Sequence, residues 1–354
     1  MTRILIVKIG AIGDVVYAMP MLGAIHEVAP KAQVSWLVGE SCADLLRGHK
    51  HLHKIFTLSD KNLFSTSIVS RLSVVKDLVG KLNKAFDLVL IAHRDPAYAF
   101  ALRPFIWGPL FQLSRDDSES QIRHTVHVPA LTTHESLAMR KLLEAGIKHL
   151  KLPTEFKWDE PFDHIFSPAV GIPESFIAVH VGGGVNIKTE FALKQWPHSV
   201  DFIRKVLEFT KFNIVVIGSS EDRRDAERSL AKLEGVEDSR IVNMMGKTSM
   251  RDLVGIIRKA KLFVGPDSGP LHIADSLRVP TIGLYGPTSH VSWGLLGEKS
   301  RAMYEGVECS PCYKDTGAFP PCPNQHRCMK ELMPTRVLDQ ALFLLGKSPG
   351  HGLI

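Results

Sequence analysis

The sequence repeats a pattern that strongly limits its fold: a short apolar run, then a glycine-containing turn, then a helical stretch. The N-terminal half shows apolar runs at 4–10 (ILIVKIG), 33–39 (QVSWLVG) and 86–92 (FDLVLIA), with a weaker one at 124–128. Apolar runs without polar alternation are typical of parallel strands buried on both faces. Strands that alternate with helices, the first helix expected from Asp14 to about Val28, predict an open, mostly parallel α/β sheet.

The same alternation starts again in the second half. Strands are predicted at 176–184, 212–220, 240–246, 261–269 and 280–287, with helices near 198–210, 222–234, 249–260, 270–278 and 335–346. Between the two series, residues 151–175 contain four prolines spaced too closely for regular structure, which indicates a linker. A chain of 354 residues also exceeds what one hydrophobic core usually holds.

We therefore expect two domains, 1–165 and 174–354, the second with a long loop at 286–334 and a C-terminal helix. Each opens on a strand and a glycine turn, which resembles the GT-B arrangement of two Rossmann-like domains facing a central cleft. In open α/β sheets, ligands bind beyond the carboxyl ends of the strands, so the chemistry is expected in those loops. Neither half contains a GxGxxG string, which disfavours a nicotinamide or flavin enzyme.

The distribution of charged residues limits the kinds of partner that we expect. The net charge is +6, and residues 1–154 hold 19 Lys+Arg against 13 Asp+Glu, whereas residues 155–354 hold 24 of each. A moderate excess in one domain suits an anionic small molecule or an acidic membrane surface better than duplex DNA, so no nucleic-acid partner is expected. No apolar run reaches the roughly 20 residues of a membrane span, and the N-terminus lacks a signal-peptide pattern, which predicts a cytoplasmic protein.

The first predicted turn carries a lysine and a carboxylate. Lys8 ends the strand, and Gly13 and Asp14 begin the helix. Asp14 has two interpretations: a helix cap, or a general base that takes a proton from an acceptor hydroxyl. Spacing alone does not separate the two.

The string VGPDSGPLH at 264–272 is the most informative in the second half. It ends a strand and opens a helix, so backbone amides and the helix dipole favour a phosphate or diphosphate. Asp267 is placed to accept hydrogen bonds from sugar hydroxyls, and Ser268 and Gly269 to let the backbone approach a ligand. The alternative is a helix cap with a buried histidine, His272.

Two further loops support a nucleotide site. Gly182, Gly183 and Gly184 follow another strand, and Lys194 lies ten residues beyond them, where an ammonium group could neutralise a phosphate. Glu221 follows the next strand, where an acid could meet a ribose hydroxyl or the base; a helix cap involving Ser220 is the ordinary alternative.

Taken in order, these strings resemble glycosyltransferase family 9, the ADP-heptose:lipopolysaccharide heptosyltransferases. The matching segments span nearly the whole chain: IGDVV, GGG with KQWP, GSSED, PDSGPLHIADSL, IGLYGPT and the late CSPC…CPNQHRCM. The resemblance implies a GT-B fold and an inverting transfer of heptose from ADP-heptose to the Kdo or heptose of the lipopolysaccharide inner core, with no cofactor required for catalysis.

The resemblance also implies roles for residues. Asp14 matches the proposed general base, Lys194 the lysine that stabilises the leaving ADP, and Asp267 the aspartate that holds heptose hydroxyls. Ser268 and Gly269 would give amides to the phosphates, with His272 one turn on, and Glu221 aligns less securely with the acid that contacts the nucleoside.

The acceptor side is less defined. Some family members carry hydroxyl residues in the first turn, where this chain has Ile9, Gly10 and Ala11. Arg94 and Arg103, after the strand at 86–92, are candidates for gripping anionic acceptor groups, beside Lys8 and Gly13. An acceptor of this kind predicts peripheral contact with the cytoplasmic face of the inner membrane.

Four cysteines gather late in the chain, in the predicted loop at 305–334. Cys309, Cys312, Cys322 and Cys328 have the spacing of a structural zinc or iron site, although the last interval is wider than in zinc ribbons. Reduced thiols that pack the loop and disulfides are the alternatives, and cytoplasmic chains disfavour disulfides. None of the three makes the segment catalytic.

Two other functions fit the same architecture. A sugar-nucleotide epimerase would turn over its substrate without an acceptor, and the basic first domain speaks against it. A nucleotide-sugar-binding subunit without transferase activity would keep the second-domain loops but have no use for Asp14.

Overall fold

The computed structural model describes residues 1–59, 82, 84–115, 124–159, 164–165, 167, 171–183, 185–186, 189–190, 192–220, 239–313 and 319–347. The chain divides into two compact units, Met1–His164 and Ile165–Ile354, and the boundary falls inside the proline-rich segment. The helix predicted at 222–234 lies outside the described residues.

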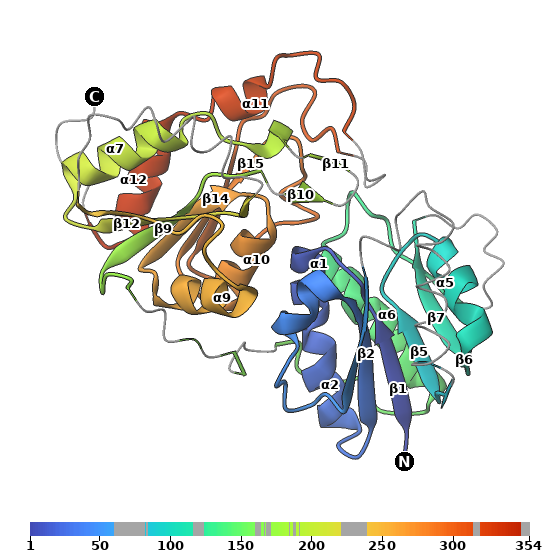
Figure 1. The fold of residues 1–354 in the computed structure, drawn as a ribbon. Helices are drawn as coiled ribbons and strands as arrows, with labels where there is room; N and C mark the ends of the chain where they lie inside the picture. Colours follow the sequence, from blue (N-terminus) through green and yellow to red (C-terminus); the bar gives the residue numbers. More distant parts are fainter. Residues whose placement is uncertain are drawn as a thin grey trace. The chain divides into compact units, whose positions relative to one another are not determined.

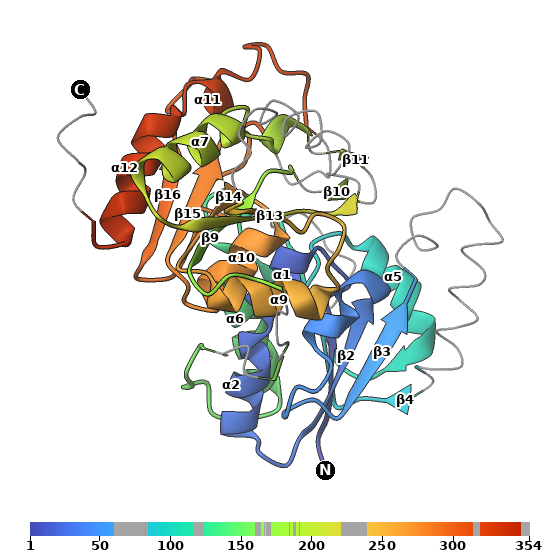
Figure 2. The ribbon, with the colours of Figure 1, turned by 60° about the vertical axis from the view of Figure 1, so that its left-hand side comes forward.

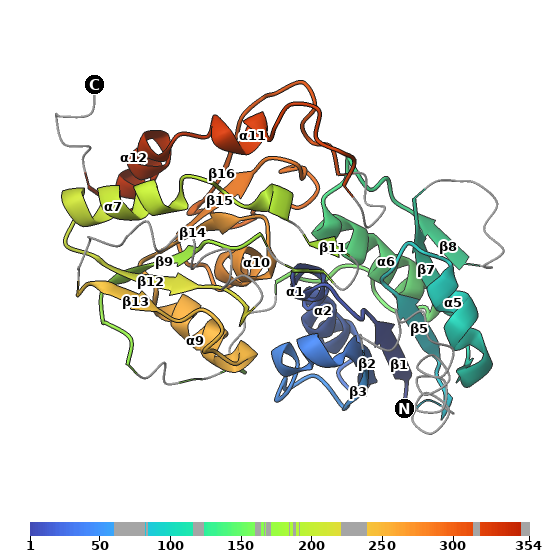
Figure 3. The same cartoon turned by 45° about the horizontal axis from the view of Figure 1, so that its top comes forward.

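Unit 1 is built on a six-stranded sheet in the order β3-β2-β1-β5-β7-β8 (Figures 1 and 3). Every neighbouring pair is parallel. The strands are β1 (Arg3–Val7), β2 (Gln33–Gly39), β3 (Lys54–Leu58), β5 (Leu88–Ile91), β7 (Leu110–Ser114) and β8 (His124–His127). A two-stranded sheet joins β4 (Lys84–Ala85) to β6 (Ile106–Trp107). The predicted parallel strands of this half are thus confirmed.

Helices cover both faces of the unit 1 sheet. They are α1 (Ile12–Ala18), α2 (Pro20–Val28), α5 (Ala97–Leu102) and α6 (Glu135–His149), with 3₁₀ turns η1 (Glu40–Leu45) and η2 (Arg103–Phe105). The expected single helix from Asp14 to Val28 is wrong because Pro20 starts a new helix after Met19. α6 packs closely on β5 at Gly146, where an added Cβ would lie 2.6 Å from Leu90 Cδ2.

Unit 2 repeats the architecture in the order β13-β12-β9-β14-β15-β16, again wholly parallel. The strands are β9 (Phe176–His180), β12 (Asn213–Ile217), β13 (Ile241–Asn243), β14 (Leu262–Pro266), β15 (Thr281–Tyr285) and β16 (Ser300–Tyr304). A short antiparallel pair joins β10 (Val185–Asn186) to β11 (Thr189–Glu190). The two sheets therefore share the strand order of a Rossmann fold, with switch points between β1 and β5 and between β9 and β14.

In unit 2, α7 and α12 lie on one face of the sheet and α9 and α10 on the other (Figures 1 and 3). The helices are α7 (Ser199–Phe209), α9 (Met250–Lys259), α10 (Gly269–Ser276), α11 (Arg327–Lys330) and α12 (Pro334–Leu344), with the turn η3 (Ala192–Lys194). Figure 2 shows α7 and α12 side by side from another direction. Among the described residues, no helix is long and apolar enough to cross a bilayer.

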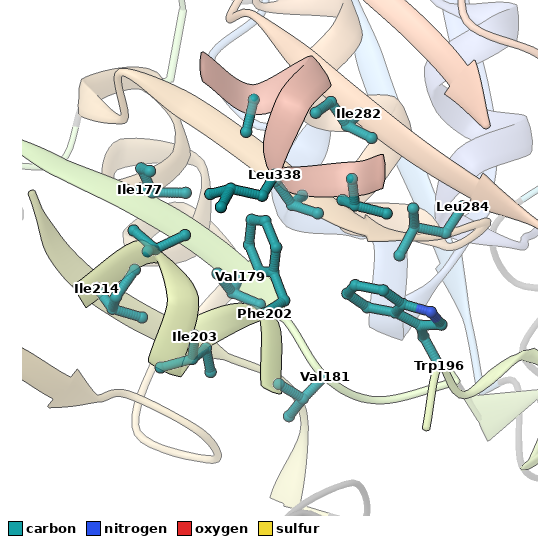
Figure 4. Packing of buried hydrophobic residues seen from close by; sticks show 14 of the residues in the cluster. Ile177, Val179, Val181, Trp196, Phe202, Ile203, Ile214, Ile282, Leu284 and Leu338 are labelled. Atoms are coloured by element: carbon teal, nitrogen blue, oxygen red, sulfur yellow. The ribbon is translucent and has the colours of Figure 1, made fainter. Parts of the chain in front are cut away.

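The core under α7 and α12 follows from strand alternation. Ile177 and Val179 of β9 point to this face, where they meet Phe202 of α7 and Leu338 of α12 (Figure 4). The indole of Trp196 lies at the edge of the same cluster, near Leu284 (Figure 4).

The expectation of one unbroken loop from 286 to 334 is wrong, because β16 and α11 form inside it. Asp275 of α10 fastens the first part: its carboxylate accepts from the amides of Leu296 at 2.7 Å and Gly297 at 2.9 Å, and from the Ser300 hydroxyl at 2.5 Å. A buried carboxylate with three donors is a strong anchor for a chain segment. The hydrogen bonds of Asp275 therefore fix the first part of the segment 286–334, in addition to any contribution from the cysteines.

Candidate functional site

The candidate site of unit 2 is centred on Asp267, the first residue after β14. Lys194 Nζ donates to the Asp267 carboxylate Oδ2 at 3.2 Å and to the Asp267 carbonyl at 3.1 Å. On the other carboxylate oxygen, Oδ1, His272 Nε2 lies at 2.9 Å. The structure thus brings together three residues that lie 73 and 5 positions apart along the chain, Lys194, Asp267 and His272.

The charge of Asp267 depends on these partners. Burial alone would raise the pKa of the Asp267 carboxyl, but the Lys194 ammonium and the His272 hydrogen bond outweigh burial and hold the pKa well below its usual range. Asp267 is therefore ionised at any physiological pH. Its charge balances that of Lys194, so the site holds a fixed carboxylate and a fixed ammonium without a net charge of its own.

Ser268 links the site to the strand beside β14. Its hydroxyl donates to the Pro266 carbonyl at 3.0 Å, and His180 Nδ1, at the end of β9, lies 3.0 Å from the same hydroxyl. Since the hydroxyl has only one hydrogen, His180 must carry its proton on Nδ1 and donate it to Ser268. The contact spans the switch point between β9 and β14, where this type of sheet binds ligands.

The start of α10 adds the features of an anion site. Ser268 is the N-cap residue but makes no side-chain cap, and the helix begins at Gly269 with Pro270 next. Amides in a first helical turn have no acceptor within the helix, and the helix dipole favours negative charge there. One alternative for the sequence 264–272 is a helix cap with a buried histidine. The structure has no side-chain cap at Ser268, but His272 is buried and forms a hydrogen bond with Asp267.

Lys194 is positioned by an anchor that the sequence did not reveal. Two residues beyond it, the buried Trp196 donates its indole N–H to the Leu332 carbonyl at 2.8 Å, and His198 Nε2 lies 2.7 Å from the Lys330 carbonyl. The segment between α11 and α12 therefore holds the chain that carries Lys194. Only a general signal, a tryptophan next to a proline, marked this position.

Two of the three predicted glycines follow β9 as expected. Gly182 and Gly183 are buried after the strand ends at His180. Gly184 and Glu221 lie outside the described residues, so their predicted roles toward a nucleotide stay predictions.

Unit 1 has its own constellation at the carboxyl end of β1. Lys8 Nζ lies 2.9 Å from Asp14 Oδ2, with the lysine side chain 6% exposed and the aspartate side chain 29% exposed. Asp14 is not the cap of α1, because the N-cap position is Ala11 and Gly13 lies between them within the helix. A half-buried carboxylate fixed by an ammonium, with one side open, is the arrangement that a general base needs.

A histidine that the sequence did not single out completes this region. His93 follows β5, and its Nε2 accepts the Ile9 amide hydrogen at 2.9 Å. β1 and β5 are the strands on either side of the switch point of this sheet, so His93 lies at the position where ligands bind in such sheets.

The two arginines proposed for the acceptor have different surroundings. Arg94 Nη1 lies 2.5 Å from Glu135 Oε1, and the two side chains are only 7% and 3% exposed. Arg103 is exposed and donates to the Gly108 carbonyl at 2.9 Å. The buried pair between the end of β5 and the start of α6 favours a structural role for Arg94, and Arg103 stays open to an anionic partner.

The Arg94–Glu135 pair leads to a stability prediction. Arg94→Met removes the guanidinium that faces the buried Glu135 carboxylate and is expected to lower the free energy of unfolding of unit 1 by about 3–5 kcal/mol. The double variant Arg94→Met/Glu135→Leu removes both charges and is expected to recover most of that loss. Urea denaturation of the two variants and of the exposed control Arg103→Met measures the differences; equal losses in the single and double variants would contradict the structural role.

The thiols of the cysteine segment, Cys309, Cys312, Cys322 and Cys328, lie close enough to influence one another's ionisation. None of the five cysteines forms a disulfide, and in the described part of the chain no group of three or more His, Cys, Asp or Glu side chains is arranged to hold a metal ion. Burial and the neighbouring thiols raise the pKa of Cys328 to about 11 and also raise that of Cys312. Asn324 Nδ2 donates to Cys309 Sγ at 3.3 Å and the His326 amide to Cys322 Sγ at 3.2 Å. Reduced thiols fit this arrangement, and the predicted zinc or iron site stays a prediction.

The architecture and the site define a class. The chain has two successive parallel sheets with Rossmann strand order. One unit carries a carboxylate held by a lysine, and the other carries an anion site with a lysine and an aspartate. This combination is the one expected of a GT-B glycosyltransferase.

Comparison with known proteins gives the family. The sequence pattern of Glycosyltransferase family 9 (heptosyltransferase) matches residues 148–322. Lipooligosaccharide heptosyltransferase 2 of Campylobacter jejuni is 26% identical over 95% of this chain and 96% of its own. Lipopolysaccharide heptosyltransferase 1 of Pseudomonas aeruginosa is 23% identical over 97% and 98%. The solved structure of E. coli heptosyltransferase WaaC with ADP superposes with a TM-score of 0.71 at 19% identity, over 97% of this chain and all of that one.

These similarities support a heptosyltransferase of glycosyltransferase family 9, an enzyme of the glycosyltransferase class. The resemblance inferred from the motifs is thereby confirmed, and so is the α/β, GT-B fold. The similarity to this family favours glycosyl transfer over the epimerase and the non-catalytic subunit.

Proposed function

We propose that the chain transfers heptose from ADP-heptose to the inner core of lipopolysaccharide, with inversion and with no cofactor in the chemical step. The observation that carries the proposal is the Lys194–Asp267–His272 arrangement at the start of α10. Support for the donor and acceptor comes from the full-length relatives named as lipopolysaccharide and lipooligosaccharide heptosyltransferases and from the WaaC structure with ADP.

Unit 2 supplies the groups suited to the donor. The Lys194 ammonium would stabilise the negative charge that develops on the departing diphosphate, and the amides at Ser268 and Gly269 would bind the same phosphates. Asp267 stays ionised and would accept hydrogen bonds from heptose hydroxyls while it holds Lys194 in place. His272 keeps that carboxylate oriented, and Gly182 and Gly183 give the backbone room beside the ligand.

Unit 1 supplies the groups suited to the acceptor. Asp14 would take the proton of the attacking hydroxyl as that oxygen forms its bond to the anomeric carbon and the bond to the diphosphate breaks. Lys8, whose Nζ lies 2.9 Å from Asp14 Oδ2, would hold the carboxylate in place. The excess of basic residues in 1–154 favours an acceptor with phosphate and carboxylate groups.

The same charge excess supports a place of action. A phosphorylated glycolipid acceptor is presented at a membrane surface, and a moderately basic domain is attracted to anionic lipid. We therefore place the enzyme, within this proposal, in the cytoplasm in peripheral contact with the inner membrane.

The test of the proposal is a transfer assay. Purified protein with ADP-heptose and a Kdo-bearing lipid acceptor is expected to release ADP, while mass spectrometry finds the acceptor heavier by one heptose. Conversion of ADP-heptose without acceptor would instead indicate an epimerase. Tight binding of ADP-heptose in calorimetry without transfer to any core acceptor would indicate a binding subunit, and either result would overturn the proposal.

A further inference from the structure

His93 is a buried histidine held rigidly at the switch point of the unit 1 sheet. It is 9% exposed and lies directly beyond β5. Its ring stacks on Tyr98 at 3.9 Å between centroids with an interplanar angle of 13°. Its carbonyl accepts from Gln112 Nε2 at 3.1 Å, and Gln112 also donates to the Asp95 carbonyl at 2.6 Å. Ring and backbone are therefore both fixed.

The hydrogen bond from Ile9 determines where the proton of the imidazole lies. An amide N–H can only donate, so Nε2 must accept at 2.9 Å with its lone pair. Burial, and then the nearby Lys8 ammonium, hold the pKa of His93 well below its ordinary value, so the ring is neutral. A neutral ring with a bare Nε2 carries its hydrogen on Nδ1.

The structure describes no acceptor for that Nδ1–H. Among the residues that it describes, none makes a hydrogen bond with His93 Nδ1. Nδ1 is not one of the fully buried side-chain atoms that lack a partner, so it reaches solvent although most of the ring is buried. A bound ligand that offers an acceptor would replace the water that otherwise bonds this nitrogen.

The charged groups near His93 indicate which kind of ligand its Nδ1–H would bind. Lys8 is already paired with Asp14 at 2.9 Å, so the region beside His93 holds an ammonium and a carboxylate that balance each other. The His93 ring is itself a neutral donor, and one neutral N–H suits an uncharged oxygen better than a phosphate, which prefers charged or multiple donors. Sugar hydroxyl and ring oxygens are acceptors of this kind.

We infer that His93 is an acceptor-binding residue, whose Nδ1–H donates to an uncharged sugar oxygen of the acceptor close to the hydroxyl that Asp14 deprotonates. The inference rests on the proposed function for the identity of the acceptor. The hydrogen bond from Ile9 also gives His93 a positioning role. It connects the turn after β1, which carries Lys8, to the segment after β5, which carries the His93 Nδ1–H. The acceptor-binding group and the Lys8–Asp14 pair are therefore held by the same contact.

The decisive experiment removes the hydrogen-bond donor of the imidazole, Nδ1–H, and keeps its hydrogen-bond acceptor, Nε2. Replacement of His93 by Nδ1-methylhistidine leaves Nε2 free for Ile9 but abolishes the Nδ1–H. We expect the KM for the lipid acceptor to rise about tenfold, the cost of one hydrogen bond at a preorganised site. The affinity for ADP, measured by calorimetry, is expected to stay unchanged. The same replacement at the exposed His53 is the matched control.

A second variant separates the positioning effect. His93→Gln offers both an amide oxygen to Ile9 and an N–H to the ligand, so it is expected to keep the acceptor KM within a few-fold of the wild type, whereas His93→Leu loses both bonds and should lower kcat as well as raise KM. An unchanged acceptor KM in the methylated protein would overturn the inference and leave His93 as a support for the β1 turn.

Nitrogen NMR tests the same inference without turnover. In ¹⁵N-histidine protein, His93 is expected to show a protonated Nδ1 and a bare Nε2, with the Nδ1 resonance shifted by the acceptor sugar and not by ADP. A proton on Nε2, or a shift caused by ADP alone, would refute it. If the wild type transfers no heptose, the proposed function fails, and these resonances still report separately whether a sugar binds at His93.

Discussion

Asp14→Asn is expected to lower kcat for heptose transfer by about 10²–10⁴-fold, the usual contribution of a general base. Asparagine has the same shape and can still accept a hydrogen bond from Lys8, so the turn after β1 should keep its structure. It cannot take up the proton of the attacking hydroxyl. Asp14 and Lys8 both lie in unit 1, whereas the proposed function assigns ADP binding to unit 2, so the affinity for ADP should not change.

The matched control is Glu40→Gln. Glu40 is an exposed carboxylate of the same unit, at the start of η1, and its loss removes one negative charge without touching the β1 turn. Initial rates at saturating donor and acceptor, with calorimetry for ADP, measure both variants. A kcat for Asp14→Asn that matches the control would show that Asp14 serves the fold and that another group removes the proton.

The strands and the loop motifs could be predicted because each is determined by residues that are close together in the sequence. A run such as 262–266 is apolar along its whole length, which only a strand buried on both faces requires, and the PDSG string after it marks the start of a helix. The same local signals placed Asp14 and Asp267 in segments that follow strands.

Elements whose stability comes from distant partners could not be predicted. β16 has only one buried residue, Met303, and its remaining side chains are half-buried or exposed, so its sequence lacks the apolar run of the other strands. It forms because it pairs with the edge of β15 and because Asp275, 25 residues before Ser300, binds the chain that enters it.

The roles of single polar residues depend on register in the same way. His93 reaches Ile9 only because Val7 of β1 lies opposite Ile91 of β5, which brings the residues after both strands together. Arg94, one position further, meets Glu135 at the start of α6. An arginine after a strand looks like a ligand-binding residue in the sequence, and only the position of α6 shows the buried carboxylate that neutralises it.

Lys194→Met is the second prediction with a large effect: kcat/KM for ADP-heptose is expected to fall about 10²–10³-fold, the usual cost of removing one charge-stabilising group from an active site. Methionine keeps the length and apolar stem of lysine and removes the ammonium that lies 3.2 Å from Asp267 Oδ2. Lys194→Arg keeps a charge and guards against a folding defect, and Lys211→Met, an exposed lysine of unit 2, is the matched control.

The pH profile separates a direct role of Lys194 from an effect on Asp267. In the wild type, Lys194 is the largest factor that lowers the pKa of Asp267, against a burial effect that raises it. Without Lys194 the pKa of Asp267 rises, so the carboxyl takes up a proton as the pH falls, and Lys194→Met should lose activity on acidification more steeply than the wild type does. Lys194→Arg should keep the wild-type profile. Parallel profiles for Lys194→Met and the wild type would mean that the remaining partners of Asp267 keep it ionised. The loss of kcat/KM would then report the proposed contact of Lys194 with the diphosphate.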